Sequence, residues 1–396
     1  MAAVNKNIAL AILILASSVA MMSTDLYAPS LAHLPDYFGA SPATVKLTMS
    51  LNALAYSLAT LVHGPLSDRY GRRPVLLIGM TAFTGFSFLC AIAQSVDQLI
   101  AARVLQGLTA AVEGVLVLSI IRDLFEKQDQ VRAIAMYGVA TALTPAAAPI
   151  LGGYIYIWFG WRMNFHLLAV IAAITTFLIW YFLEESGRRD QPALSARRVL
   201  LDYASLLGNW QFVRYNLIGG ATFGFFFAFI TAGPFILITG HGLPTEYFGY
   251  FEGLAILCYM CGSYLAARLA GRLPGDTIML IGVGITVAGA LFLMLVVYGG
   301  METPATLAIA ISLTAFGDGP VFAATPSLAM NATSVRTGAS AAMVVAIEIG
   351  ICSLAAFAVG VFHDGTSRPF ALTCFALALI IVGAFTGGRA SGRIQA

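Results

Sequence analysis

Charge is scarce in this chain. Only 10% of its 396 residues are Asp, Glu, Lys or Arg, whereas 59% are hydrophobic. A soluble globular protein has about 25% charged residues, so the surface of this chain cannot face water on all sides. The mean hydropathy of +0.86 agrees, and both values indicate an integral membrane protein. The net charge of +2 comes with no basic cluster large enough to bind nucleic acid.

Cysteines are also few, and all lie in apolar runs, so no disulfide framework is indicated. They are Cys90, Cys258, Cys261, Cys352 and Cys374. The second and third are spaced to share one helix face, but no further metal ligands lie near them, so we expect no metal site. The sequence also lacks a nucleophile–base constellation and a nucleotide-binding loop. We therefore expect neither an enzyme nor an ATP-driven pump, and no cofactor.

Long apolar runs are what the chain has instead. A spanning helix needs about 20 apolar residues, and runs of this length suit helices rather than barrel strands. The first run has features of a secretory signal, but its pattern continues through Asp25 and Pro29, so we interpret it as a span. The sequence predicts twelve spans, at 8–29, 44–66, 74–94, 99–121, 131–157, 162–183, 212–239, 247–269, 277–299, 305–329, 338–362 and 368–387.

The charged residues between the spans predict orientation and organisation. Most of the 21 Lys and Arg fall on the side of the termini, which places both termini in the cytoplasm by the positive-inside rule. The longest hydrophilic stretch follows the sixth span. We expect two six-helix bundles, 1–183 and 212–396, joined by a cytoplasmic linker, 184–211. A short repeat, GRRP at 71–74 and GRLP at 271–274, supports a duplicated transporter.

Four motifs carry a family resemblance. They are GPLSDRYGRRP at 64–74, TDLYAPSLAHLP at 24–35, RVLQG at 103–107 and TPAAAPILGG at 144–153. The chain resembles the major facilitator superfamily, in particular its twelve-span drug:proton antiporters of the bicyclomycin and chloramphenicol exporter type. The resemblance implies a multi-pass protein of the bacterial inner membrane that exports small amphipathic molecules in exchange for protons. We expect a functional monomer whose partners are substrate, protons and the lipid bilayer.

Two groups of residues take roles from this resemblance. In the family, the first loop is a latch between the two halves when the cavity faces outward; here it comprises Gly64, Asp68, Arg69, Gly71, Arg72 and Arg73. The antiporter motif occupies the fifth span, with Pro145, Pro149, Gly152 and Gly153. Proline bends a helix and glycine permits close helix approach, so we expect this span to be bent and tightly packed between the halves.

Three ionisable residues inside the first half are candidates for proton coupling, because charge in a span is costly and marks function. Asp25 and Arg103 lie at similar predicted depth, which suggests an ion pair; a purely structural pair is the alternative. The resemblance associates both with proton coupling. Glu113 lies deeper on the same span as Arg103 and is either a second proton site or a buried hydrogen-bonding group.

Candidate substrate contacts are Tyr27, Tyr56, Gln106, Phe226, Asp318 and Glu348. Aromatic faces favour flat apolar or cationic molecules. Asp318 is flanked by two glycines and Pro320, so we expect an irregular helix there that lines a cavity. Glu252, one or two turns into the eighth span, is a weaker candidate. Two functions remain open beside drug export, namely export of an endogenous metabolite such as a siderophore and proton-coupled import.

Overall fold

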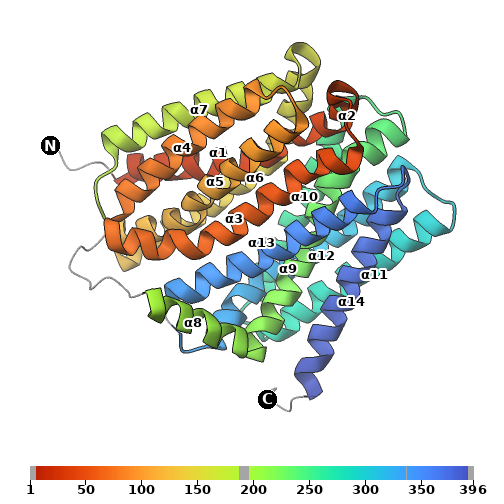
Figure 1. Ribbon diagram of the computed structural model, residues 1–396. Coiled ribbons are helices and arrows are strands. Elements are labelled where there is room, and N and C mark those ends of the chain that lie inside the picture. Colours follow the sequence, from red (N-terminus) through yellow and green to blue (C-terminus); the bar gives the residue numbers. More distant parts are fainter. Residues whose placement is uncertain (1–5, 187–195, 336, 391–396) are drawn as a thin grey trace.

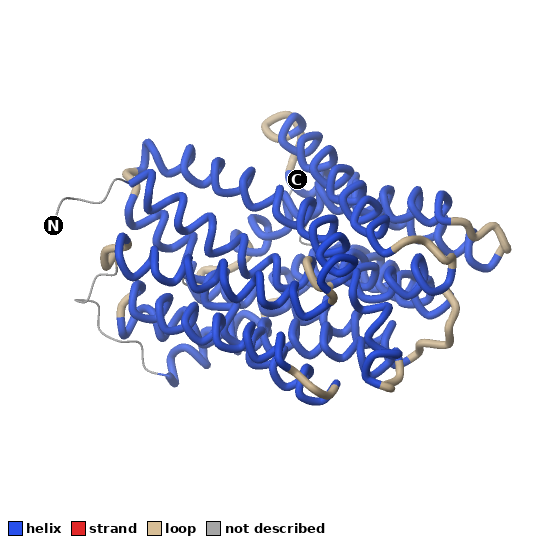
Figure 2. The backbone as a smooth tube through the Cα atoms, turned by 90° about the horizontal axis from the view of Figure 1, so that it is seen from above, coloured by secondary structure: helices blue, strands red, loops and turns tan. Residues whose placement is uncertain are grey.

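The computed structural model describes residues 6–186, 196–335 and 337–390. The described chain is helical nearly throughout, with short connections (Figure 2). Twelve of the described segments are long and apolar enough to span a membrane, which confirms the predicted all-α, twelve-span class. The predicted linker, 184–211, includes residues 187–195, which lie outside the described residues.

The first six spans begin with a broken one. It comprises α1 (Lys6–Asp25), the 3-10 helix η1 (Ala28–His33) and α2 (Leu34–Phe38), so it extends beyond the predicted end at residue 29. The other five are α3 (Pro42–Tyr70), α4 (Arg72–Ile92), α5 (Val96–Leu124), α6 (Lys127–Phe159) and α7 (Trp161–Phe182).

A short helix, α8 (Ala196–Gly208), precedes the second six spans. These are α9 (Trp210–Pro234) with the π-helix η2 (Phe235–Gly240), α10 (Thr245–Leu269), α11 (Gly275–Tyr298), α12 (Pro304–Asn331), α13 (Thr337–Val361) and α14 (Arg368–Ala390). An even number of spans places residues 6 and 390 on the same membrane side. We call that side the terminal face and the other the distal face.

The two halves meet along two helix pairs, α3 with α13 and α6 with α10. Figure 1 shows α3 and α13 side by side over most of their length. Two hydroxyls bond across this seam. Ser57 Oγ donates to the Ala346 carbonyl at 2.7 Å, and Ser353 Oγ donates to the Ser50 carbonyl at 2.8 Å. On the terminal side, α8 reaches the first half through Tyr203, whose hydroxyl donates to the Leu61 carbonyl at 2.9 Å.

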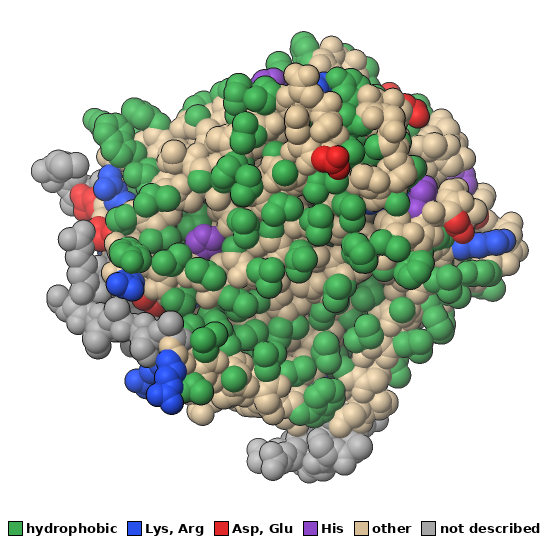
Figure 3. Space-filling view, viewed as in Figure 1, with side chains coloured by type: hydrophobic (Ala, Val, Ile, Leu, Met, Phe, Trp, Pro, Cys, Tyr) green, Lys and Arg blue, Asp and Glu red, His purple; other side chains and the backbone are tan. Residues whose placement is uncertain are grey.

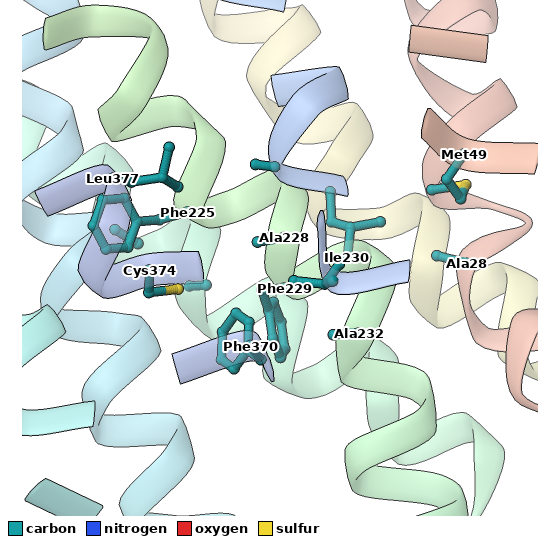
Figure 4. Packing of buried hydrophobic residues seen from close by; sticks show 14 of the residues in the cluster. Ala28, Met49, Phe225, Ala228, Phe229, Ile230, Ala232, Phe370, Cys374 and Leu377 are labelled. Carbon is teal, nitrogen blue, oxygen red and sulfur yellow. The ribbon is translucent and has the colours of Figure 1, made fainter. Parts of the chain in front are cut away.

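Apolar side chains cover the middle of the molecule both outside and inside. Figure 3 shows them across the central band of one face, with Lys and Arg gathered mainly at its left edge. Inside the second half, aromatic rings from α9 and α14 pack together, as Phe229 does against Phe370 (Figure 4). An apolar exterior is the surface that a bilayer requires.

The predicted irregularity at Asp318 is wrong, because α12 runs as one α-helix from Pro304 to Asn331. The flanking glycines instead allow α11 and α10 to pack closely against α12. A Cβ on Gly317 would lie 2.4 Å from Thr286 Oγ1 in α11, and one on Gly319 would lie 2.3 Å from the Ser263 nitrogen in α10. The irregular helix of the second half is η2, which follows Pro234. A π-helical turn of this kind often marks a functional site.

Candidate functional site

Arg103 on α5 is the centre of a buried polar network in the first half. It is 0% exposed. Its Nη1 donates to the Ser23 carbonyl at 2.9 Å and to Gln106 Oε1 at 2.5 Å, and its Nε donates to the Thr48 carbonyl at 3.3 Å. Gln106 continues the network to α4 by donating to Ser87 Oγ at 2.8 Å. One guanidinium therefore ties α1, α3 and α5 together.

The predicted Asp25–Arg103 ion pair is absent among the described residues, and the end of α1 explains why. That helix ends at Asp25, and the carbonyls of a last helical turn have no intrahelical partner. The Ser23 carbonyl is in this turn and accepts from Arg103, where a cation also interacts favourably with the helix dipole. Asp25 is 6% exposed and lies close enough for its charge to act on Arg103.

Two of the predicted substrate contacts of the first half are built into this buried region. Tyr27 is 1% exposed, and its hydroxyl shares a hydrogen bond of 3.1 Å with Thr48 Oγ1. The Arg103 guanidinium lies 5.4 Å from the centre of its ring. Gln106 is 0% exposed. Both residues hold the Arg103 network in the structure described, and contact with substrate remains a prediction for each.

Glu113 lies further along α5, where α1, α3 and α6 approach. It is 4% exposed, and the Ser17 side chain is a hydrogen-bond partner. Ser17 Oγ also accepts from the Tyr137 hydroxyl at 3.0 Å. The Tyr56 hydroxyl packs against the neighbouring turn, because a Cβ on Gly114 would lie 2.1 Å from it. The structure therefore places the predicted residues Glu113 and Tyr56 in one polar cluster.

Two of the buried acids in the second half are predicted substrate contacts. Asp318 and Glu348 are each 5% exposed, and each has one carboxylate oxygen without a hydrogen-bond partner among the described residues. Asp318 and Phe226 line the same pocket, between α9, α11, α12 and α14, with Phe225 and Phe229. The pocket is apolar apart from its acid and a few hydroxyls, and its volume of about 10 Å³ leaves it nearly closed in this structure. Glu348 instead faces α9, where a Cβ on Gly219 would lie 2.5 Å from its Oε1.

The loop between α3 and α4 has its described charge contacts within the first half. Arg72 pairs with Asp68 across 3.8 Å and makes a closer ion pair with Asp123 of α5. Arg73 donates to the Trp180 carbonyl at 2.6 Å. The latch between the halves stays a prediction, because these partners are all in the first half.

The same loop turns at Gly71, which has a φ of 95°. A side chain is disfavoured there both by this backbone conformation and by Glu185, whose Oε2 would lie 2.4 Å from a Cβ. Glu185 accepts from the Arg72 amide at 2.9 Å, so it caps the N-terminus of α4, a position that favours an anion. The other predicted loop residues make looser contacts. A Cβ on Gly64 would lie 3.7 Å from Val115 Cγ1, and the Arg69 guanidinium lies 5.1 Å from the centre of the Tyr70 ring.

Helix α6 packs tightly between α1 and α10. A Cβ on Gly152 would lie 2.0 Å from the Leu26 carbonyl, and one on Gly153 would lie 3.0 Å from the Glu246 Cα. From the other side, a Cβ on Gly249 of α10 would lie 2.5 Å from the Ile150 Cα. Pro145 and Pro149 lie inside this helix without ending it. The predicted close packing between the halves is thus present at the distal ends of α6 and α10.

Sequence reasoning missed a polar cavity at the distal face. Lys46 reaches from the distal end of α3 into the second half and donates to His363 Nδ1 at 2.8 Å. The cavity beside it has a volume of about 170 Å³ and is also lined by His241 and Glu302, which lie 3.2 Å apart. Glu185 and the full burial of Glu252 were missed as well. The position of Lys46 inside the predicted span 44–66 was the one feature of the sequence that pointed to this cavity.

The chain belongs to the Major Facilitator Superfamily, whose family model matches residues 13–355. It is 29% identical over 371 residues to an uncharacterized MFS-type transporter, YdgK, of Bacillus subtilis, covering 92% of this chain and 91% of that protein. It is 29% identical over 342 residues to multidrug resistance protein D of Escherichia coli, with coverage of 86% and 85%. It is 24% identical over 376 residues to a chloramphenicol resistance protein of Pseudomonas aeruginosa, with coverage of 94% and 89%.

Solved structures show the same fold. A bacterial homologue of the human lysosomal transporter Spinster superposes with a TM-score of 0.73 at 15% identity, covering 96% of this chain and 95% of that one. A peptide transporter, POT, superposes with a TM-score of 0.76 at 14% identity, with coverage of 97% and 95%. The expected major facilitator fold is therefore confirmed, and the chain is a member of this transporter superfamily.

Proposed function

We propose that this chain exports small amphipathic organic molecules in exchange for protons, by alternating access, across the bacterial inner membrane. In this proposal the terminal face is cytoplasmic, the distal face points outward, and one copy is the working unit. Two relatives that are named for drug resistance support the substrate class. The concentration of Lys and Arg on the terminal side supports the orientation.

The observation that carries proton coupling is a buried carboxyl beside a fixed cation. Arg103 is held by carbonyls of α1 and α3, so its charge stays in place while Asp25 is not among the groups that hold it. A nearby cation favours the ionised carboxylate, whereas burial favours the neutral acid. A change in water access to Asp25 as the halves move would shift this balance, and the proton gradient would then supply the free energy without a cofactor.

The substrate would meet apolar surface with few polar groups. Phe226 and Asp318 line the pocket of the second half, and Glu113 with Tyr56 lies in the polar cluster of the first half. Aromatic faces bind flat apolar molecules and attract cations. A site of this composition suits a range of amphipathic compounds better than one highly polar metabolite.

Accumulation of radiolabelled chloramphenicol tests the proposal. Cells without their own efflux pumps should retain less of it when they carry this gene, and a protonophore should abolish the difference. The Asp25→Asn variant, present in the membrane at the same level, should give no difference. Faster uptake that the protonophore abolishes would instead establish an importer. An unchanged retention of chloramphenicol and other drugs would contradict drug export and favour an endogenous product.

A further inference from the structure

Glu252 is a buried acid whose carboxylate lacks partners. It lies on α10, is 0% exposed, and neither carboxylate oxygen has a hydrogen-bond partner among the described residues. Burying an ionised carboxylate without a donor is very costly. The site therefore accommodates the neutral acid, so Glu252 must carry a proton while it is buried there.

The burial of Glu252 depends on contact between the halves. One turn before it, Gly249 packs on α6, where a Cβ would lie 2.5 Å from the Ile150 Cα. Directly after it, Gly253 faces the Ala146 carbonyl, at 3.5 Å from the position of a Cβ. The face of α10 around Glu252 is thus covered by α6 from the other half. Separation of α6 from α10 at the distal face would admit water to this carboxyl.

The charged surroundings of Glu252 are sparse. Asp25 lies close enough for its charge to act on Glu252. The residue after Asp25, Leu26, packs through its carbonyl against Gly152 of α6. Residues 141–153 of α6 carry no titratable side chain. From the remaining helices, His33 reaches Thr245, about two turns from Glu252. Asp318 acts on Tyr259, about two turns further along α10.

We propose that Glu252 is a proton-binding residue of the distal gate. The closed α6–α10 interface accepts its neutral acid, and opening of the distal face lets the O–H proton leave to distal water. On closing, a proton from that side binds the carboxylate again. Because Glu252 is enclosed while the distal face is closed, its proton returns to the side from which it came. It is therefore distinct from the proton that Asp25 would carry across.

This inference rests on the alternating access of the proposed function but not on the substrate or the direction of transport. It can be tested in substrate-free protein. Nitroxide labels at Gln94→Cys and Met301→Cys, in a background without the native cysteines, would report the separation of the halves at the distal face by double electron–electron resonance. Both positions are exposed on distal loops, one in each half.

One linked proton changes the ratio of open to closed protein by tenfold per pH unit. Above about pH 6.5, where a solvent-exposed glutamate is ionised, the ratio of open to closed protein in the unsubstituted chain should rise with this slope. Glu252→Gln, a permanently neutral mimic, should be mostly closed and independent of pH, as should Glu252→Met if the first variant folds poorly. Glu246→Gln, in the first turn of the same helix, should keep the slope.

Three outcomes would overturn the proposal. They are an unsubstituted chain whose open fraction is constant over this range, a Glu252→Gln variant that keeps the slope, and an Asp25→Asn variant that alone loses it. Each can occur whether or not the chain lowers chloramphenicol retention. Loss of drug export with a retained Glu252-dependent slope would contradict the proposed function and leave this inference standing.

Discussion

Lys46 Nζ lies 2.8 Å from His363 Nδ1 and 3.3 Å from the Val359 carbonyl, which joins the two halves at the distal face. The ammonium also lies 4.5 Å from the centre of the Phe235 ring. Lys46 is 1% exposed, and a cation this deeply buried depends on its partners. The closed distal face is thus held by a contact that exists only while the halves are together.

Removal of the histidine should open the distal face. His363→Leu leaves the ammonium of Lys46 without its nitrogen acceptor, at a cost of about 1.5–3 kcal/mol for a charged hydrogen bond. The open fraction should rise about tenfold or more, as measured with the labels at 94 and 301. The double variant Lys46→Met/His363→Leu removes the buried charge too and should return close to the unsubstituted value. An additive double variant would contradict the pairing.

Acid should open the same contact. Burial, and then the Lys46 ammonium, lower the pKa of His363 from its ordinary value of 6.5. The closed face therefore holds neutral His363, and protons favour the open face as the pH falls below that value. Asp364 opposes the effect weakly, and His241 with Glu302 lines the same cavity. His363→Asn keeps an acceptor and should lose the acid-induced opening, whereas His241→Asn should retain it.

The fold could be predicted from the sequence because the bilayer imposes a length on apolar runs. Each predicted span overlaps one of the twelve observed segments. Two local predictions differ. The first span continues through η1 and α2 despite two prolines. The glycines around Asp318 do not break α12, because a glycine that ends a helix and one that admits a neighbour look alike in sequence.

The candidate site was less predictable, because the depth of a residue in the membrane does not show which neighbouring helix its side chain faces. Asp25 and Arg103 were correctly placed near each other, but the sequence does not show that α1 ends at Asp25 and leaves a carbonyl for the guanidinium. Lys46 and His363 are 317 positions apart, so no local pattern connects them. Glu252 was a weaker candidate in the sequence, because its burial comes from α6, a helix of the other half, and no pattern on its own helix shows this.

Arg103→Lys should weaken the first half although it keeps the charge. A lysine ammonium cannot reproduce the planar fork that reaches Ser23, Thr48 and Gln106. At least one buried carbonyl would lose its donor, at about 1–3 kcal/mol. The midpoint of thermal unfolding in detergent should fall clearly below that of Arg122→Lys, an exposed position on the same helix. Equal midpoints would show that the network does not stabilise the fold.

The two copies of the repeated turn offer a matched comparison. Gly71 and Gly271 have φ values of 95° and 81°, so alanine at either position carries backbone strain of about 1–3 kcal/mol. Only at Gly71 would the new Cβ also meet Glu185, whereas nothing lies within 4 Å of it at Gly271. Gly71→Ala should therefore lower the unfolding midpoint more than Gly271→Ala. The reverse order would show that the Glu185 cap contributes little.

A methyl group on α10 should bias the chain toward the open distal face. At Gly249 a Cβ would lie 2.5 Å from the Ile150 Cα, a backbone atom that cannot move aside, whereas at Gly253 the nearest atom is 3.5 Å away. The clash exists only while α6 and α10 are packed together, so Gly249→Ala should raise the open fraction without lowering the amount of folded protein. Gly253→Ala, about one turn further along, should match the unsubstituted chain. If both variants stay equally closed, the α6–α10 contact is not the distal gate.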